Sequence, residues 1–364
     1  MPIDKKDLVV PSKLKSLDEF FEIAMPTHSI SRAISNNLYG ISNNNTVSMV
    51  PRSKNSYGFA FFTRPQLNLQ TENLRKDRKL YQFLTTRNAS IQRYVRMMLD
   101  PRLYYLPEEN LRCPFIDNKL AFIPMLTNNL HSMSGWNDIV LPTYTSPDGV
   151  RREQWTIADG AIDIYDSWDL DCTFRNVKDD PMTLMLYLWV RYIADVFEGI
   201  LMPYTDFVAQ REIDYQTRVY RLVMDETKTY VKNIGIAPVA FPVNLPLGKF
   251  FDFSKATPYA DQTAEINIRF KCTGAEYSDD ILIEEFNETS AIFNPDIAKL
   301  LSGSRNHSLE KVPQGLLDIF NYRCYPIINT NTLELEWYVD TTTKTYKRIV
   351  EYLKLVTKYN NNQG

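Results

Sequence analysis

Alternating apolar and polar residues mark several strands in the middle of the chain. Between residues 264 and 272 every second residue is apolar, and the residues 168–174 follow the same alternation. A two-residue period is typical of an antiparallel strand with one buried and one exposed face. The pattern also predicts a hairpin of two strands, 217–224 and 230–236, and a further strand at 332–339.

A second period, of three to four residues, predicts helices. In the segment 90–99, apolar side chains recur on one helical face, and Asp100-Pro101 ends the pattern. Proline lacks the amide that a helix needs and disfavours helical backbone at the residue before it. The segment 343–358 carries a similar apolar stripe. Two shorter helices are expected at 17–24 and 295–301.

The segment 180–198 predicts the longest uninterrupted apolar helix. Asp180 can cap the free amides, Pro181 suits the first helical position, and Gly199 suits a left-handed end. Few residues of this segment are polar, so the helix must be covered on most sides. Part of that cover is expected from another subunit.

The prolines and turns suggest where the chain divides. Residues 101–147 contain many prolines and little periodicity, and Ser146-Pro147-Asp148-Gly149 is a strong turn signal. We therefore expect an α+β protein with an N-terminal mixed extension at 1–148. An antiparallel sheet or barrel domain with a packed helix should follow at 149–294, and a C-terminal segment ending in a helix at 295–364.

Composition narrows the classes of function. The 364 residues include 41 Lys and Arg and 44 Asp and Glu, a formal net charge of -3. Duplex-DNA binders need clustered cations, so this balance argues against that class. Gly is scarce at 12, whereas 22 Tyr and 19 Phe supply large side chains for a core or for interfaces.

Catalytic and metal-binding patterns are missing from the sequence. The 3 His and 4 Cys are widely spaced, without the close ligand pair that zinc sites usually show. No phosphate-binding loop, dinucleotide fingerprint or nucleophile elbow occurs. We therefore expect no catalytic residue, no metal and no cofactor.

Two charged clusters and one histidine leave alternatives open. We interpret one acidic cluster as a solvated face, the alternative being a site for Mg²⁺ or Ca²⁺. The cluster comprises Asp159, Asp163, Asp166, Asp169 and Asp171. We interpret the basic run 75–79 as the solvated start of a helix, the alternative being a contact to phosphate or to an acidic partner. We expect His131 to have a structural role. The alternative is a hydrolase that uses His131 with Asp169 and Asp171.

The order of these elements resembles a known family. A strand at 168–174 leads into the helix that begins at Asp180-Pro181 and carries Trp189. The hairpin 220–231, Phe241-Pro242-Val243 and the strand 265–272 follow. This arrangement is similar to the tube-forming domain of contractile phage tails and to baseplate tube-initiator proteins. In that family, strands of neighbouring subunits close a barrel around a lumen, and a helix packs outside it.

The resemblance implies a non-enzymatic virion protein of the tail. It would form a ring as a baseplate tube initiator, tail tube or tail-completion subunit, and would contact copies of itself and neighbouring tail proteins. DNA would pass through without specific binding. A neck, head-completion or baseplate wedge protein is the alternative. The candidate lumen residues are Asp169, Asp171, Glu265 and Asn267, and the candidate interface residues are Trp168, Trp189, Tyr192, Phe197 and Tyr220.

The sequence shows no pattern typical of a secretion signal or of a membrane-spanning segment. No charged-then-apolar leader opens the sequence, and no run approaches the ~20 apolar residues that span a bilayer. We therefore expect synthesis in the host cytoplasm and no disulfides.

Overall fold

The computed structural model describes residues 57–160, 166–252, 255, 264–313, 324–343, 346–348, 350–352 and 354. The chain divides into two compact units, Met1–Asn55 and Ser56–Gly364, and every described residue belongs to the second. The predicted helix at 17–24 therefore lies outside the described residues. The terminal helix is described in part, and the residues 346–348, 350–352 and 354 are helical.

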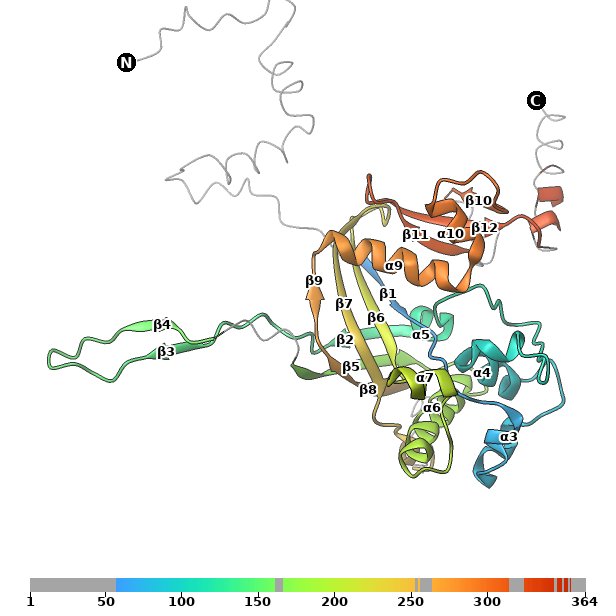
Figure 1. Ribbon diagram of the computed structural model, residues 1–364, viewed down its shortest axis with the longest axis horizontal. Helices are drawn as coiled ribbons and strands as arrows, with labels where there is room; N and C mark the ends of the chain where they lie inside the picture. The colour runs from blue at the N-terminus through green and yellow to red at the C-terminus, as the bar shows by residue number, and fades with distance from the viewer. Residues whose placement is uncertain are drawn as a thin grey trace, which may run out of the picture. The chain divides into compact units, whose positions relative to one another are not determined.

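One antiparallel sheet forms the centre of the described unit (Figure 1). Its strands lie in the order β1-β6-β7-β8-β5-β2, and the short strand β9 pairs with β7. Within the described residues no pairing joins β1 to β2, so these strands are arranged as an open sheet. The strand bounds are Tyr57–Phe62 for β1, Leu130–Ser134 for β2, Ser167–Arg175 for β5, Thr217–Met224 for β6, Val231–Pro242 for β7, Glu265–Thr273 for β8 and Glu276–Tyr277 for β9.

The alternation in the sequence correctly predicted the strands β5 and β8. Both show strict alternation of buried and exposed residues, and they pair over their full length from Ser167–Thr273 to Arg175–Glu265. The predicted hairpin is present as β6 and β7, although β7 runs on to Pro242. One face of β5 and β8 thus enters the core and the other faces solvent.

Helices α4 (Ile91–Leu99) and α6 (Pro181–Phe197) belong to the main core, together with the buried side chains of β5 and β8. Helix α4 begins after Ser90, whose hydroxyl caps the helix by accepting the Arg93 amide. The capping expected of Asp180 was wrong: Asp180 adopts left-handed backbone, and its side chain accepts from Asn176 instead of from the helix amides. Gly199 does have the left-handed conformation that the sequence predicted.

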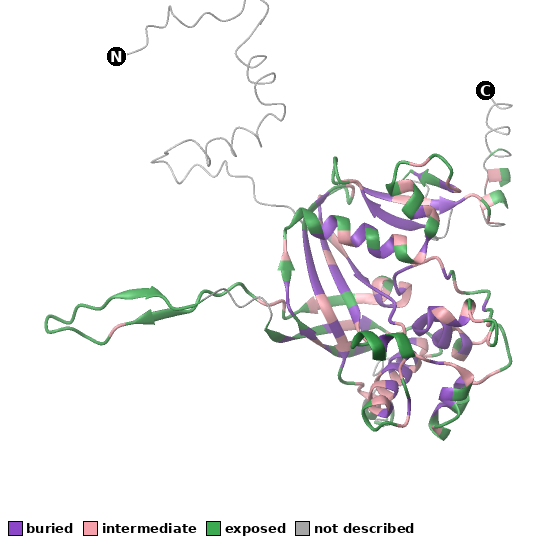
Figure 2. Cartoon of the chain, viewed as in Figure 1, coloured by how far each residue is buried: buried purple, intermediate pink, exposed green. Residues whose placement is uncertain are grey.

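A second core lies under helix α9 (Asp280–Phe293), which sequence periodicity did not predict. Figure 2 shows α9 beside the sheet with buried and exposed residues alternating along it. Phe286 is fully buried and lies at the centre of an aromatic cluster. The chain then forms α10 (Pro295–Leu301) and a three-stranded sheet in the order β10-β12-β11, with β10 at Leu309–Val312, β11 at Tyr325–Ile328 and β12 at Leu335–Asp340.

The central sheet crosses the boundary expected near residue 148. Strands β1 and β2 precede that boundary, yet β1 pairs with β6 and β2 pairs with β5. The turn at 146–149 instead joins two short strands, β3 (Thr143–Thr145) and β4 (Thr156–Ala158). The remaining elements are α3 (Thr71–Leu74), η1 (Arg78–Phe83), η2 (Pro101–Tyr104), α5 (Pro124–Asn129), α7 (Thr205–Gln210) and η3 (Leu247–Phe250).

Candidate assembly surface

The solvent face of β5 and β8 carries ordered pairs of opposite charge. Asp169 lies opposite Lys271, and Asp171 lies opposite Arg269. Lys271 Nζ and Arg269 Nε each lie 2.9 Å from a carboxylate oxygen of their partner. All four side chains are exposed, so water and salt screen each ion pair and it stabilises the fold only weakly. Their main effect is on the charge of the surface.

We call this face the ladder. Its next charged pair is Arg175 opposite Glu265, so three cations face three carboxylates. Thr173 and Asn267 lie opposite each other between the charged pairs. A surface with balanced charges at such short spacing has a weak field beyond the first layer of water, because the opposite charges cancel and salt screens the remainder.

The four candidate lumen residues therefore share one exposed surface. Asp169, Asp171, Glu265 and Asn267 all lie on the solvent side of β5 or β8. This surface has balanced charges, because Lys271 and Arg269 lie among the carboxylates. Its place at a lumen stays a prediction.

The structure places most of the candidate interface residues inside the chain's own core. Trp168, Trp189, Tyr192 and Tyr220 are buried, and a side chain buried in its own chain has no surface left for a partner. The Trp189 indole donates to the Tyr215 carbonyl, and the Tyr192 hydroxyl donates to Asp214. These contacts satisfy the polar atoms within the monomer.

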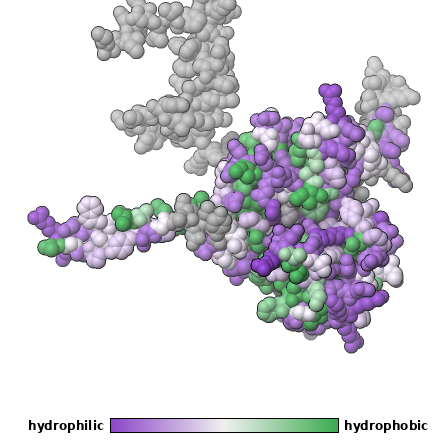
Figure 3. Space-filling model, viewed as in Figure 1, coloured by the Kyte–Doolittle hydropathy of each residue, from purple (hydrophilic) through white to green (hydrophobic). Residues whose placement is uncertain are grey.

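Phe197 is different, because 93% of its surface is exposed at the end of α6. Figure 3 shows hydrophobic residues gathered near α6 and α7, where Met202 and Val208 are exposed as well. Phe197 thus remains a candidate interface residue.

Several exposed apolar side chains lie close together in sequence in the hairpin at 139–158, which we call the arm (Figure 1). Strands β3 and β4 pair at Thr143–Ala158, Tyr144–Ile157 and Thr145–Thr156. Every residue of both strands is exposed. A two-stranded hairpin alone is at best marginally stable in water, so the arm requires further packing to hold one conformation.

The arm has one apolar face and one polar face. Tyr144 and Ile157 lie opposite each other, and the backbone hydrogen bonds between the two strands continue to Ser146 and Trp155. Side chains alternate between the faces of a strand, so Tyr144, Trp155 and Ile157 project from the same side. The other side carries Thr143, Thr145, Thr156 and Ala158.

Sequence reasoning found the turn of this arm but did not predict the hairpin. Ser146-Pro147-Asp148-Gly149 was interpreted as a boundary between domains. The signal that could have identified the arm is the pair of short segments that flank the turn, Thr-Tyr-Thr and Trp-Thr-Ile-Ala, both rich in residues that favour strands.

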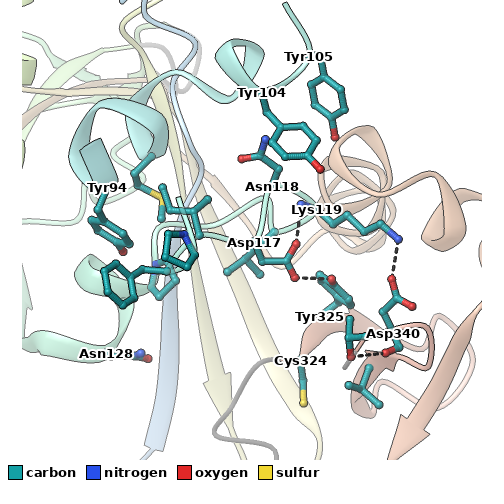
Figure 4. A pocket seen from close by; sticks show the side chains of 18 residues that line it. Tyr94, Tyr104, Tyr105, Asp117, Asn118, Lys119, Asn128, Cys324, Tyr325 and Asp340 are labelled. Carbon is teal, nitrogen blue, oxygen red and sulfur yellow. Dashed lines mark hydrogen bonds and ion pairs between the residues drawn. The ribbon is translucent and has the colours of Figure 1, made fainter. Parts of the chain in front are cut away.

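A pocket of about 660 Å³ lies between residues 94–128 and the C-terminal strands (Figure 4). Its walls are braced by two polar contacts. The Tyr325 hydroxyl donates to Asp117 at 2.5 Å, and Lys119 Nζ lies 2.6 Å from Asp340 Oδ2. These contacts join the segment around residue 118 to β11 and β12.

Two buried carboxyl groups have strongly shifted pKa values. Burial raises the pKa of Asp100 to about 7, although the Leu69 amide and the Tyr204 hydroxyl donate to it. Burial and the neighbouring Asp77 carboxyl raise the pKa of Asp195 to about 6. Both groups hold segments of the main core together.

The same network fixes helix α6 to η1. Arg191 Nη2 lies 2.7 Å from Asp195 Oδ1, and Arg191 Nε lies 3.1 Å from Asp77 Oδ2. Burial would raise the pKa of Asp77, but hydrogen bonds from the Lys79 amide and Arg191 outweigh it and lower this pKa. Arg191 therefore bridges two carboxyl groups of different acidity.

The residues that the sequence offered for catalysis or metal binding form contacts with other side chains of the fold. Asp169 and Asp171 form ion pairs with the side chains of Lys271 and Arg269 in the ladder. His131 Nε2 lies 3.7 Å from Glu265 Oε1. Asp163 lies outside the described residues. Among the residues that the structure describes, no group of three or more His, Cys, Asp or Glu could hold a metal ion. None of the described helices has the length and apolar character to cross a membrane.

Comparison with known structures gives only distant likenesses. The anti-feeding prophage cap, a tube-terminating cap, is 13% identical with a TM-score of 0.27, over 43% of this chain and 81% of that chain. The PVC sheath/tube terminator of an extracellular contractile injection system is 14% identical with a TM-score of 0.25, over 44% and 88%. At these TM-scores the likenesses carry no argument.

The comparison with protein families covers far more of the chain than the comparison with solved structures. No curated protein matches the chain. A family model described as "Putative phage tail tube protein" matches residues 6–356, which include the sheet, the ladder and the arm. Because this match spans nearly the whole sequence, the chain belongs to that family of phage tail tube proteins.

Proposed function

We propose that this chain is a structural, non-enzymatic subunit that assembles with copies of itself into a ring of a phage tail. The family itself implies a structural role in the tail and a place in the virion. The ring and the position of its surfaces are our inference from the described residues.

The observation that carries the proposal is the apolar face of the arm. Tyr144, Trp155 and Ile157 are largely exposed on a hairpin that buries almost nothing in its own chain. Burying one such side chain contributes about 1.5–3 kcal/mol, so three of them are a strong driving force for association. We infer that the arm packs on a neighbouring subunit.

The ladder supports the second part of the proposal, a surface that faces the DNA channel. DNA must move past this surface without being held, and an excess of cations would bind the phosphates. The three paired cations and carboxylates leave the ladder neutral. A surface of this kind neither attracts nor strongly repels a passing polyanion.

The arrangement of the central sheet agrees with closure between subunits. Strand β1 lies at one end of the strand order and β2 at the other, and no other strand of the described residues pairs along their outer sides, apart from the contacts of Ala121–Ile123 with the end of β1. Open sheet edges associate readily, because their backbone amides and carbonyls seek partners. A ring could therefore extend the sheet from one subunit to the next.

The test is to measure the oligomeric state of the purified full chain. Size-exclusion chromatography with light scattering should detect a species larger than the monomer, and negative-stain images should show rings. A variant in which a short Gly-Ser linker replaces residues 139–158 should remain monomeric. A wild-type chain that stays monomeric at every concentration, alone and with tail extracts, would refute the proposal.

Labelling the protein in particles would then separate the alternatives. A gold label along the tail tube or at its ends supports a tail ring. A label confined to the head–tail junction would instead assign the chain to the neck.

A further inference from the structure

We propose that the arm of one copy inserts Trp155 into the pocket between residues 94–128 and the C-terminal strands of the next copy. This inference rests on the proposed function and names the surface that receives the arm. The indole would lie against the pocket's aromatic side chains, and the arginines of the arm turn would lie near its carboxylates.

Trp155 has the properties of an interface anchor. The chain has five tryptophans, all of them described, and Trp155 is the one that is exposed, at 74%. Exposed tryptophan is costly in water, and tryptophan is among the residues that most often dominate binding at protein interfaces. Since it is so exposed, Trp155 does not occupy the pocket of its own chain.

The backbone holds Trp155 in a defined place at the end of the arm. Its amide donates to the Ser146 hydroxyl at 3.0 Å, and the Ser146 amide donates to the Trp155 carbonyl at 2.8 Å. The turn beyond is closed by the Gly149 amide, which donates to the Glu153 carbonyl at 2.9 Å. An anchor that is already positioned loses less entropy on binding.

The pocket has the features expected of its receptor. Tyr105 and Phe115, which are 63% and 60% exposed, line the pocket, and Tyr94 and Tyr104 add further aromatic surface. Aromatic rings pack favourably against an indole. Figure 4 shows Tyr104 and Tyr105 beside Asn118 and near Asp117 and Lys119. The contacts of Asp117 and Lys119 with the C-terminal strands keep the walls in place.

Asn118 supplies a partner for the indole N–H. Among the described residues, its side-chain oxygen and nitrogen are buried and have no hydrogen-bond partner. A buried indole usually donates to an acceptor. A rotation of Asn118 toward the pocket would offer its oxygen to Trp155 and satisfy both groups.

The charges of the two surfaces are complementary. The charged residues that line the pocket are Asp117, Asp340 and Lys119, so carboxylates outnumber cations. On the arm turn, Arg151 and Arg152 are exposed, and neither forms an ion pair with another described residue. The turn also carries the carboxylates of Asp148 and Glu153, which keep their charge but are held inside the turn, where Asp148 accepts from Gln154 and Glu153 accepts from the Arg151 amide.

The contact joins two different surfaces, so it is head-to-tail. Such contacts repeat from copy to copy and generate closed rings or helical stacks, as the proposed tail assembly requires.

The test is disulfide cross-linking between differently tagged copies. All four native cysteines are buried, so introduced cysteines supply the exposed thiols. One copy carries Gln154→Cys, next to Trp155, and the other carries Tyr105→Cys at the pocket. A matched control pairs Gln154→Cys with Tyr81→Cys, which is exposed on η1. We expect about tenfold more tagged heterodimer from the first pair, because docking raises the effective concentration of the two thiols.

A second pair of variants isolates the anchor. Adding Trp155→Ser should reduce the cross-link to the level of the control, whereas Val150→Ser, which removes another exposed apolar residue of the arm, should leave it unchanged. Rings without a cross-link above the control would overturn this pairing and leave the proposed function standing. A wild-type chain that never associates would refute the proposed function itself.

Discussion

Tyr144 and Ile157 lie directly opposite each other on the arm, and both project from a face that covers nothing in their own chain. Replacing both with serine, together with Trp155→Ser, should abolish self-association. The fold of the remaining chain should be unaffected, since these side chains make little contact with it. Light scattering would report the association, and thermal unfolding would report the stability.

The opposite face of the arm provides the control. Replacing Thr143, Thr145 and Thr156 with serine keeps a hydroxyl at each position and leaves the apolar face intact. These variants should assemble like the wild type. If both sets lose assembly equally, the arm acts through its own folding and not through its apolar face.

The ladder predicts a specific effect of charge on DNA binding. Asp169→Lys with Asp171→Arg places two further cations beside Lys271 and Arg269. Such a surface should bind duplex DNA, and that binding should fall about tenfold or more between 50 and 200 mM salt as counterions compete. Fluorescence anisotropy with a labelled duplex measures this change, and the wild type should show little binding.

A charge-swapped variant distinguishes net charge from residue identity. Adding Lys271→Asp and Arg269→Asp to the previous pair restores opposite charges across the strands. This variant should lose the gained DNA binding. Strong binding by the wild type itself would contradict a channel surface that lets DNA pass.

Helix α9 predicts a large stability effect at one position. Phe286 is fully buried, and its ring lies 5.1 Å from that of Phe122 and 5.3 Å from that of Phe61. Phe286→Ala should lower the free energy of unfolding by about 3–5 kcal/mol, because it leaves a cavity in the second core. Ile292→Ala, on the exposed side of the same helix, should change it by about 0.5 kcal/mol or less. Equal effects in urea unfolding would show that α9 is not packed as described.

Asp195 makes the stability of the main core depend on pH. Its pKa is raised to about 6 in the fold, above the ordinary value of 3.8, so the fold favours its protonated form. This contribution is complete below about pH 4 and is lost as the pH rises through 6. Asp195→Asn cannot ionise, so its stability relative to the wild type should rise by about 1–2 kcal/mol from pH 4 to pH 7.5. Urea unfolding at both pH values measures the difference.

The groups around Asp195 provide the control for that experiment. Arg191, Asp77 and Glu198 all interact with its carboxyl group. Asp206 is an exposed carboxylate paired with Arg102, and its pKa is lowered, so its contribution to stability is lost only below about pH 4. Asp206→Asn should therefore show little change relative to the wild type between pH 4 and pH 7.5. A pH-independent difference for Asp195→Asn would mean that Asp195 remains ionised throughout.

Local patterns in the sequence determined the strands and the main helices. Strict alternation was enough to place β5 and β8, and Pro181 with Gly199 was enough to place α6. These signals are local, because they depend on side-chain period and backbone preference. Helix α9 was missed because buried polar residues, including Asn287 and Ser290, interrupt its apolar stripe and bind the C-terminal strands instead.

Burial, in contrast, was decided only by the tertiary structure. The sequence identified Trp189, Tyr192 and Tyr220 as large apolar side chains, but it could not distinguish a core from an interface, because both require the same residues. The fold covers these three with distant segments and leaves Trp155 exposed on the arm. The same holds for the ladder: the alternation placed Asp171 and Arg269 on polar faces, and only the pairing of β5 with β8 brought their charges together.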